Sequence, residues 1–131
     1  MKKTIQSAIL MMAFLPAICF AQAKKATWPE MKKFHSFMAA TFHPAEEGNL
    51  APLKAKADSL YITAQLWQAS AIPSNFKPEE TAKTLAKLVK QCANIKKAVG
   101  GNLADSALKA MITEAHEIFH TIVGECRKAD D

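Results

Sequence analysis

The stretch from Leu103 to Cys126, LADSALKAMITEAHEIFHTIVGEC, decides the fold class of this 131-residue chain. Its apolar side chains recur every three or four residues, which is the period of an amphipathic α-helix. The stripe that they form is Ala104, Leu108, Met111, Ala115, Ile118, Phe119, Ile122 and Cys126. A helix with one apolar face buries that face against other helices. The stretch therefore predicts the last helix of a helical bundle.

The first helix is expected to begin at Thr27-Trp28-Pro29-Glu30, where Thr27 and Glu30 form a capping box and proline stands in the first turn. It is expected to run to about Phe42 and to stop before Pro44, since the residue before a proline is biased away from helical angles. Its apolar stripe consists of Met31, His35, Met38 and Phe42. This spacing predicts that His35 faces the core.

Two more helices are predicted between the first and the last. The second covers about residues 50–70, and the third begins at Pro78 and ends at the Gly100-Gly101 pair. Asn102 is then expected to be the N-cap of the last helix. Four helical patterns with short connections and no strand pattern predict an all-α fold, namely an antiparallel up-down four-helix bundle.

The chain begins with the pattern of a cleavable secretory signal peptide. Lys2-Lys3 forms a short positive region, an apolar run follows from Ile5 to Phe20, and Ala21-Gln22-Ala23 fits a cleavage site. Cleavage after this site would export residues 24–131, about 108 residues, as one bundle domain that is periplasmic or secreted. A retained membrane anchor is one alternative, although the run is short for a span. Lipidation of Cys19 is the other, although the residue before it is not small.

Composition narrows the classes of partner. The formal charge of +5 falls to +3 when Lys2 and Lys3 are removed with the signal peptide. The remaining lysines are spread over every predicted helix and the only arginine is Arg127, so nucleic-acid binding is not expected. No second apolar run is long enough for a membrane span, so none is expected after cleavage.

Two cysteines remain in the mature chain, Cys92 and Cys126. An oxidising compartment would permit a disulfide between them. Both also fall on apolar stripes, so two buried thiols are an equal interpretation. Nothing in the chain resembles C-x-x-C, and the zinc-knuckle, thioredoxin-like and covalent c-type haem classes therefore lose their main support.

Histidines of the first and last helices form the strongest candidate for a functional site. His116 and His120 lie four residues apart, so their rings share one face of the last helix. If the first and last helices pair antiparallel, His35 lies level with this pair. Neutral imidazoles from facing helices are typical ligands of zinc and copper ions. The sequence thus predicts a metal site made of His35, His116 and His120, with histidines that only pack as the alternative.

Two weaker sets of donors accompany these histidines. Met31 and Met38 flank His35 by about one turn on either side. Core packing is the simpler interpretation of both, and thioether ligation of Cu(I) or haem is the functional one. His43 with Glu46-Glu47 follows the first helix, about 12 Å from His35 along the axis. His43 and Glu47 are expected either to hold a separate ion or to cap helix ends.

The segment His116-Glu117-Ile118-Phe119-His120 also matches the H-E-x-x-H signature of zinc proteases. In those enzymes both histidines bind zinc and the glutamate activates water. Here the motif lies close to the C-terminus, so only Glu125 is a formal third ligand. No strand is predicted that would align a peptide substrate. We interpret the match as coincidental and do not expect an enzyme.

A signal peptide, a small four-helix bundle, a first helix with Met and His and a last helix with His together resemble the exported four-helix cytochromes. These are the soluble periplasmic b-type cytochrome and the cytochrome c-prime group. The resemblance covers the mature chain as architecture and ligand placement. It implies axial haem ligands, which here would be Met31 or His35 together with His116 or His120. The attachment motif of the c-prime group is absent, so the haem would be haem b bound non-covalently.

Three functions stay open from the sequence. The first is an exported module that binds zinc or copper through histidines of the first and last helices, with a redox or metal-delivery protein as its partner. The second is an electron-transfer protein that binds haem b. The third is a structural or interaction bundle without a metal. The additional histidines favour the first function over the second.

Overall fold

The fold is described by a computed structural model covering residues 27–129. Its four α-helices are α1 (Pro29–Glu46), α2 (Ala51–Ala69), α3 (Pro78–Gly100) and α4 (Asp105–Gly124). Within this part of the chain there is no β-strand, and a single antiparallel bridge joins Phe76 to Arg127. The predicted all-helical class is therefore confirmed for these residues. The signal peptide predicted over residues 1–23 lies outside them.

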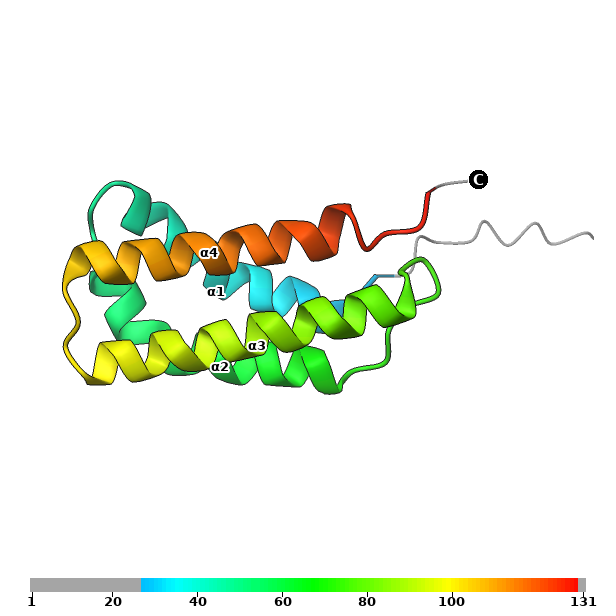
Figure 1. Ribbon diagram of the computed structural model, residues 1–131, viewed down its shortest axis with the longest axis horizontal. Coiled ribbons are helices and arrows are strands. Elements are labelled where there is room, and N and C mark those ends of the chain that lie inside the picture. Colours follow the sequence, from blue (N-terminus) through cyan, green and yellow to red (C-terminus); the bar gives the residue numbers. More distant parts are fainter. Residues whose placement is uncertain (1–26, 130–131) are drawn as a thin grey trace, which may run out of the picture.

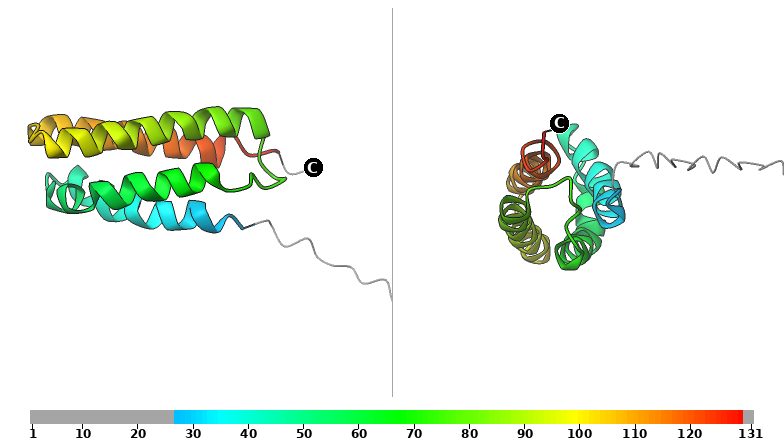
Figure 2. Two further views of the ribbon diagram at one scale, coloured as in Figure 1. Left: turned by 90° about the horizontal axis from the view of Figure 1, so that it is seen from below. Right: turned by 90° about the vertical axis from the view of Figure 1, so that its right-hand side faces the viewer.

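The four helices run alternately up and down around a common core (Figures 1 and 2). Each helix packs against its neighbours in the chain, and α1 also packs against α4, so the first and last helices lie side by side. We call this α1–α4 contact the seam; it is the sparsest of the four interhelical contacts. None of the described helices is both long enough and apolar enough to cross a membrane.

Aromatic rings fill the part of the core near the start of α1. Trp67 of α2 is fully buried among them. It contacts Trp28, Phe34 and Phe119, with ring centroids 5.4–5.9 Å from its own. Such pairs add about 0.5–1.5 kcal/mol each beyond the area that they bury. Trp28 Nε1 donates a hydrogen bond to Ser70 Oγ at 2.7 Å, which satisfies a buried donor. The rings thus tie α1, α2 and α4 together.

Helix α1 presents a different face to the core from the one that its sequence suggests. Its buried residues are Phe34, Met38, Thr41, Phe42 and Ala45. His35 is exposed, and the prediction that it faces the core is wrong. The reason is that Phe34, the larger apolar side chain, buries completely. Burying it turns the core-facing side of the helix by roughly 45° from the predicted stripe, at 100° per residue, so Met38 and Phe42 stay buried while His35 moves to the surface.

The end of α1 also differs from the prediction, because the helix passes through Pro44 and continues to Glu46 instead of stopping near Phe42. A proline lacks the N–H of an ordinary residue, but in the last turn this leaves only one carbonyl without its helical partner. The backbone N–H groups of residues 47–49 donate to the carbonyls of Pro44 and Ala45 and close the turn. His43 therefore lies on the helix rather than in a loop.

Two N-caps predicted from the sequence are not formed. The N-cap of α1 is Trp28 rather than Thr27, and no side chain makes a capping hydrogen bond there. Helix α4 begins at Asp105 with Ala104 as its N-cap, whereas Asn102 was expected in this role. Asn102 instead has a left-handed backbone conformation with φ of +52°, which asparagine tolerates better than most residues. It therefore belongs to the turn after α3.

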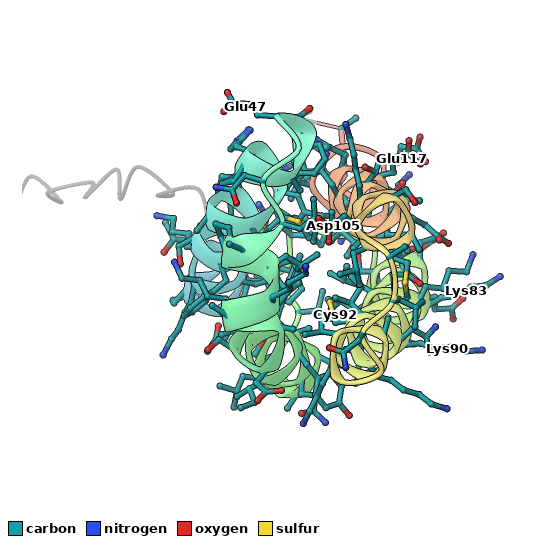
Figure 3. All side chains as sticks on the ribbon, turned by 90° about the vertical axis from the view of Figure 1, so that its left-hand side faces the viewer. Glu47, Lys83, Lys90, Cys92, Asp105 and Glu117 are labelled. Atoms are coloured by element: carbon teal, nitrogen blue, oxygen red, sulfur yellow. The ribbon has the colours of Figure 1, made fainter. Side chains whose placement is uncertain are left out.

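Both mature cysteines are free and buried, Cys92 within α3 and Cys126 just after α4. Cys126 Sγ lies 3.7 Å from Thr84 Oγ1, and Thr84 is two turns, about 12 Å, from Cys92 along α3. A disulfide needs Cα atoms within about 7 Å of each other, so these two cysteines do not pair. Figure 3 shows Cys92 directed into the space between the helices. Burial raises the pKa of its thiol to about 12.

Candidate metal centre

The chain contains four histidines, and all of them lie along the seam between α1 and α4. His35 and His43 belong to α1, and His116 and His120 belong to α4. His35 and His116 each stack on an aromatic ring of the opposite helix. His116 is half-buried, and the other three are exposed. We call these four side chains the histidine cluster.

The rings of His116 and His120 place two nitrogen atoms side by side. Their Nε2 atoms are 3.1 Å apart, and the ring planes are nearly perpendicular at 87°. Two nitrogen ligands of a tetrahedral zinc ion, each about 2.0–2.1 Å from the metal, lie about 3.3 Å from each other. The pair therefore needs little movement to bind one ion through both Nε2 atoms. The same separation also fits a hydrogen bond from one imidazole to the other.

Aromatic rings of the opposite helix hold two of these imidazoles in place. His35 of α1 stacks on Phe119 of α4, with ring centroids 5.1 Å apart and planes within 5° of parallel. His116 of α4 stacks on Phe42 of α1 at 3.7 Å and 13°. Phe119 is next to His120 in the chain, so the predicted level of His35 along the bundle is confirmed. His35 and His120 are exposed and His116 is half-buried, however, so these imidazoles do not lie inside the core as predicted.

His43 forms a second contact between metal-binding groups at the end of α1. Its Nδ1 atom lies 3.3 Å from Oε2 of Glu46, three residues further along the helix. Both side chains are exposed, at 68% and 52% of their surface. Glu47, which the sequence paired with His43, is directed away from the bundle (Figure 3). The structure thus brings His43 together with the neighbouring glutamate instead.

The charge state of His116 depends on its burial and on the ionisable groups around it. Its pKa is lowered, first because its ring is partly buried and next because His120 would add a second positive charge beside it. His43 and His35 lower it further, whereas the carboxylate of Glu46 acts in the opposite direction. Four ionisable groups thus act on the imidazole of His116. A lowered pKa keeps His116 neutral at neutral pH, which is the form that binds a metal.

The predicted methionine ligands belong to the core or pack against it. Met38 is completely buried and belongs to the hydrophobic core, and Met31 is a half-buried residue packed against that core. Their positions agree with the simpler interpretation, which is core packing. Thioether ligation by Met38 would require opening the core around it.

The structure also locates the glutamate of the H-E-x-x-H match. Glu117 is exposed and points away from the bundle (Figure 3). Among residues 27–129, no three His, Cys, Asp or Glu side chains are grouped closely enough to hold a metal ion together. The pair of His116 and His120 would therefore have to gain further ligands, either from water or from a side chain that moves.

Sequence reasoning missed the importance of Glu46, Phe42 and Phe119. The spacing of three residues between His43 and Glu46 is a helical neighbour signal, but Pro44 was expected to end the helix before it applied. The two phenylalanines look like ordinary core residues in the sequence. Only the pairing of α1 with α4 shows that each of them supports an imidazole from the other helix.

Comparison with known proteins adds no relative. A scan against protein-family models gives no match, and neither do searches of curated proteins and of solved structures.

Proposed function

We propose that this protein is an exported module that binds a transition-metal ion, zinc or copper, through His116 and His120 of α4. The observation that carries this proposal is the 3.1 Å separation of the two Nε2 atoms, which is close to the spacing of two nitrogen ligands on one ion. Support also comes from the lowered pKa of His116, since a neutral imidazole is required for binding.

His35 is the best placed third ligand in this proposal. Its ring is exposed and rests on Phe119, so it can leave the stack by rotation about its side-chain torsions without opening the core. Because Phe119 precedes His120 in the chain, the rotated ring would start close to the ion. Water would complete the coordination sphere, and an exposed site of this kind suits exchange of the ion with a metal-delivery partner.

The haem alternative has less support from the same residues. An axial methionine from α1 would have to come from Met38, which has no exposed surface, or from half-buried Met31. The ring of His120 is exposed. A haem joining these groups would have to displace core side chains. Loss of a large side chain from a core costs about 2–5 kcal/mol in stability.

Metal analysis and calorimetry test the proposal. Protein purified from its own export compartment, without a histidine tag, should contain zinc or copper and show no Soret absorbance. Titration of the chelator-stripped protein with Zn²⁺ should show binding that weakens more than about tenfold in His116→Gln and in His120→Gln. Glu117→Gln, between the two histidines, is the matched control and should bind as the wild type does. Equal Zn²⁺ binding by the wild type and the double variant His116→Gln/His120→Gln would refute the site.

A further inference from the structure

We propose that the histidine cluster binds two metal ions, and that the second ion binds to His43 and Glu46 at the end of α1. This inference rests on the proposed function, which it extends from one ion at His116 and His120 to a pair of neighbouring sites. The ligand class is a divalent ion that accepts one imidazole nitrogen and one carboxylate oxygen, as Zn²⁺ does.

The donor atoms of His43 and Glu46 are spaced as two ligands of one ion would be. Nδ1 of His43 and Oε2 of Glu46 are 3.3 Å apart, which is the separation expected of two ligands on one tetrahedral ion with bonds of about 2.0–2.2 Å. Both residues lie on the last turn of α1, so the helix backbone fixes their relative position. Lys109 Nζ of α4 also donates to the carbonyl of Glu46 at 3.1 Å, which anchors this turn to α4.

The two pairs are distinct sets of donors on different helices, one on α1 and one on α4. Phe42 lies against one imidazole of each pair, with its ring centroid 3.7 Å from that of His116 and 5.7 Å from that of His43. No three donors are grouped for a single ion anywhere in residues 27–129. The donors therefore form two pairs, His116 with His120 on α4 and His43 with Glu46 on α1, and His35 is the further ligand proposed for the first pair.

Electrostatic repulsion predicts the order in which the two sites bind their ions. His43 and Glu46 are close enough to His116 for both to influence its charge. An ion at His116 and His120 would therefore repel a second ion bound nearby, and the Glu46 carboxylate would offset part of this repulsion. The second ion is also held by exposed side chains that water screens and competes for. We therefore expect the site at His43 and Glu46 to fill after the first, with lower affinity.

As an ion pair alone, the contact between His43 and Glu46 contributes little. Exposed pairs of this kind stabilise a protein by about 0–1 kcal/mol. Substitution of either residue should therefore leave the fold intact, which circular dichroism and the melting temperature will verify. The variants can then be used to count ions without the complication of unfolding.

Calorimetry with Zn²⁺ on the full exported protein, combined with elemental analysis, tests the inference. The wild type should bind two ions in two steps. His43→Gln and Glu46→Gln should each lose the weaker step and keep the stronger one, whereas His120→Gln should lose the stronger step. Glu47→Gln is the matched control, since its side chain points away from the bundle, and it should keep both steps.

Two results would overturn the inference in different ways. Binding of one ion by the wild type, unchanged by His43→Gln but lost in His120→Gln, would remove the second site and leave the proposed function standing. The absence of any Zn²⁺ or Cu²⁺ binding by the wild type would remove both. Two ions whose binding is unaffected by Glu46→Gln would show that the second site lies elsewhere.

Discussion

The imidazole of His35 on α1 stacks on the ring of Phe119 on α4, with the two planes within 5° of parallel. The same relationship recurs in the opposite direction, because His116 on α4 stacks on Phe42 on α1. The first and last helices are thus joined by two aromatic pairs, and each helix supplies one imidazole and one phenyl ring. The orientation of two candidate metal ligands depends on this packing, so changes in the phenyl rings should affect both stability and metal binding.

Removal of the Phe42 ring should destabilise the protein strongly. Phe42 is 6% exposed, and Phe→Ala substitution of a buried residue costs about 3–5 kcal/mol in the free energy of unfolding. Urea unfolding of Phe42→Ala measures this loss. Phe37→Ala, on the same helix at a half-buried position, is the control and should cost clearly less. Similar losses in the two variants would mean that the seam does not depend on Phe42.

Stability should fall as the solution is acidified below about pH 6.5. The folded protein holds the pKa of His116 below its ordinary value of about 6.5. In the interval between the two values the unfolded chain binds more protons, so stability rises with pH there. The contribution is complete above about pH 6.5 and disappears as the pH falls to the folded pKa. Urea unfolding of metal-free protein at several pH values measures it.

His116→Gln is the variant that isolates this pH effect. It removes the titrating ring, so the variant should lose the part of the pH dependence that the wild type shows below about pH 6.5. A pH profile identical to that of the wild type would assign the effect to other groups. His43→Gln, at an exposed position, serves as the comparison.

Zinc should stabilise the folded protein by an amount that grows with the logarithm of its free concentration divided by Kd. An ion that binds only the folded state adds about 2.7 kcal/mol when its free concentration is about 100 times Kd. Thermal melts with Zn²⁺ and with a chelator measure this difference. In His116→Gln/His120→Gln only the smaller contribution of the weaker site at His43 and Glu46 should remain. A zinc-dependent shift in melting temperature as large as that of the wild type would contradict the assignment of the site.

Loss of the Ser70 hydroxyl should destabilise the aromatic part of the core. Ser70 Oγ accepts the hydrogen bond of the buried Trp28 Nε1 at 2.7 Å, and Ser70→Ala would leave that donor without a partner. An unsatisfied buried donor costs about 1–3 kcal/mol. Thermal or urea unfolding will show the change, with Ser74→Ala in the following loop as an exposed control. Equal stability of both variants would mean that another group satisfies the indole.

The two cysteines should be inert in the folded protein. Cys92 is completely buried and its pKa is raised to about 12, so almost none of it is thiolate at neutral pH. Cys126 is buried as well. A thiol reagent should therefore label both only after unfolding in denaturant, and oxidation of the native protein should give no internal disulfide. Rapid labelling of the native protein would contradict the packing described for α3.

The sequence supports the class of fold better than the orientation of α1. The helices follow from their apolar periods and from Pro78 and the glycine pair after α3. In α1, however, two stripes fit the sequence and share Met38 and Phe42, one through His35 and the other through Phe34. Local spacing does not distinguish them. The choice depends on the rings that α2 and α4 offer to Phe34, and these come from distant parts of the chain.

For the candidate site too, contacts within one helix could be predicted from the sequence, whereas contacts that depend on how the helices pack could not. The proximity of His116 and His120 follows from their spacing on one helix, and the level of His35 follows from antiparallel pairing. Whether the imidazoles lie inside or outside the bundle depends on the rotation of α1, which the sequence did not reveal. The partner of His43 was misjudged because Pro44 is tolerated in the last helical turn, where little hydrogen bonding is lost.

Because α1 and α4 are antiparallel neighbours, the start of α1 and the end of α4 lie at the same end of the bundle (Figure 1). An ion held by His116 and His120 alone would connect residues of one helix and would restrain the unfolded chain very little. With His35 as a third ligand, the same ion would become a cross-link that closes a loop of about 85 residues. In the chain-entropy description such a closure stabilises the folded state by about 4.5 kcal/mol. The metal would then be a reversible cross-link between α1 and α4. Its release would weaken the seam, which is the sparsest interhelical contact of the bundle.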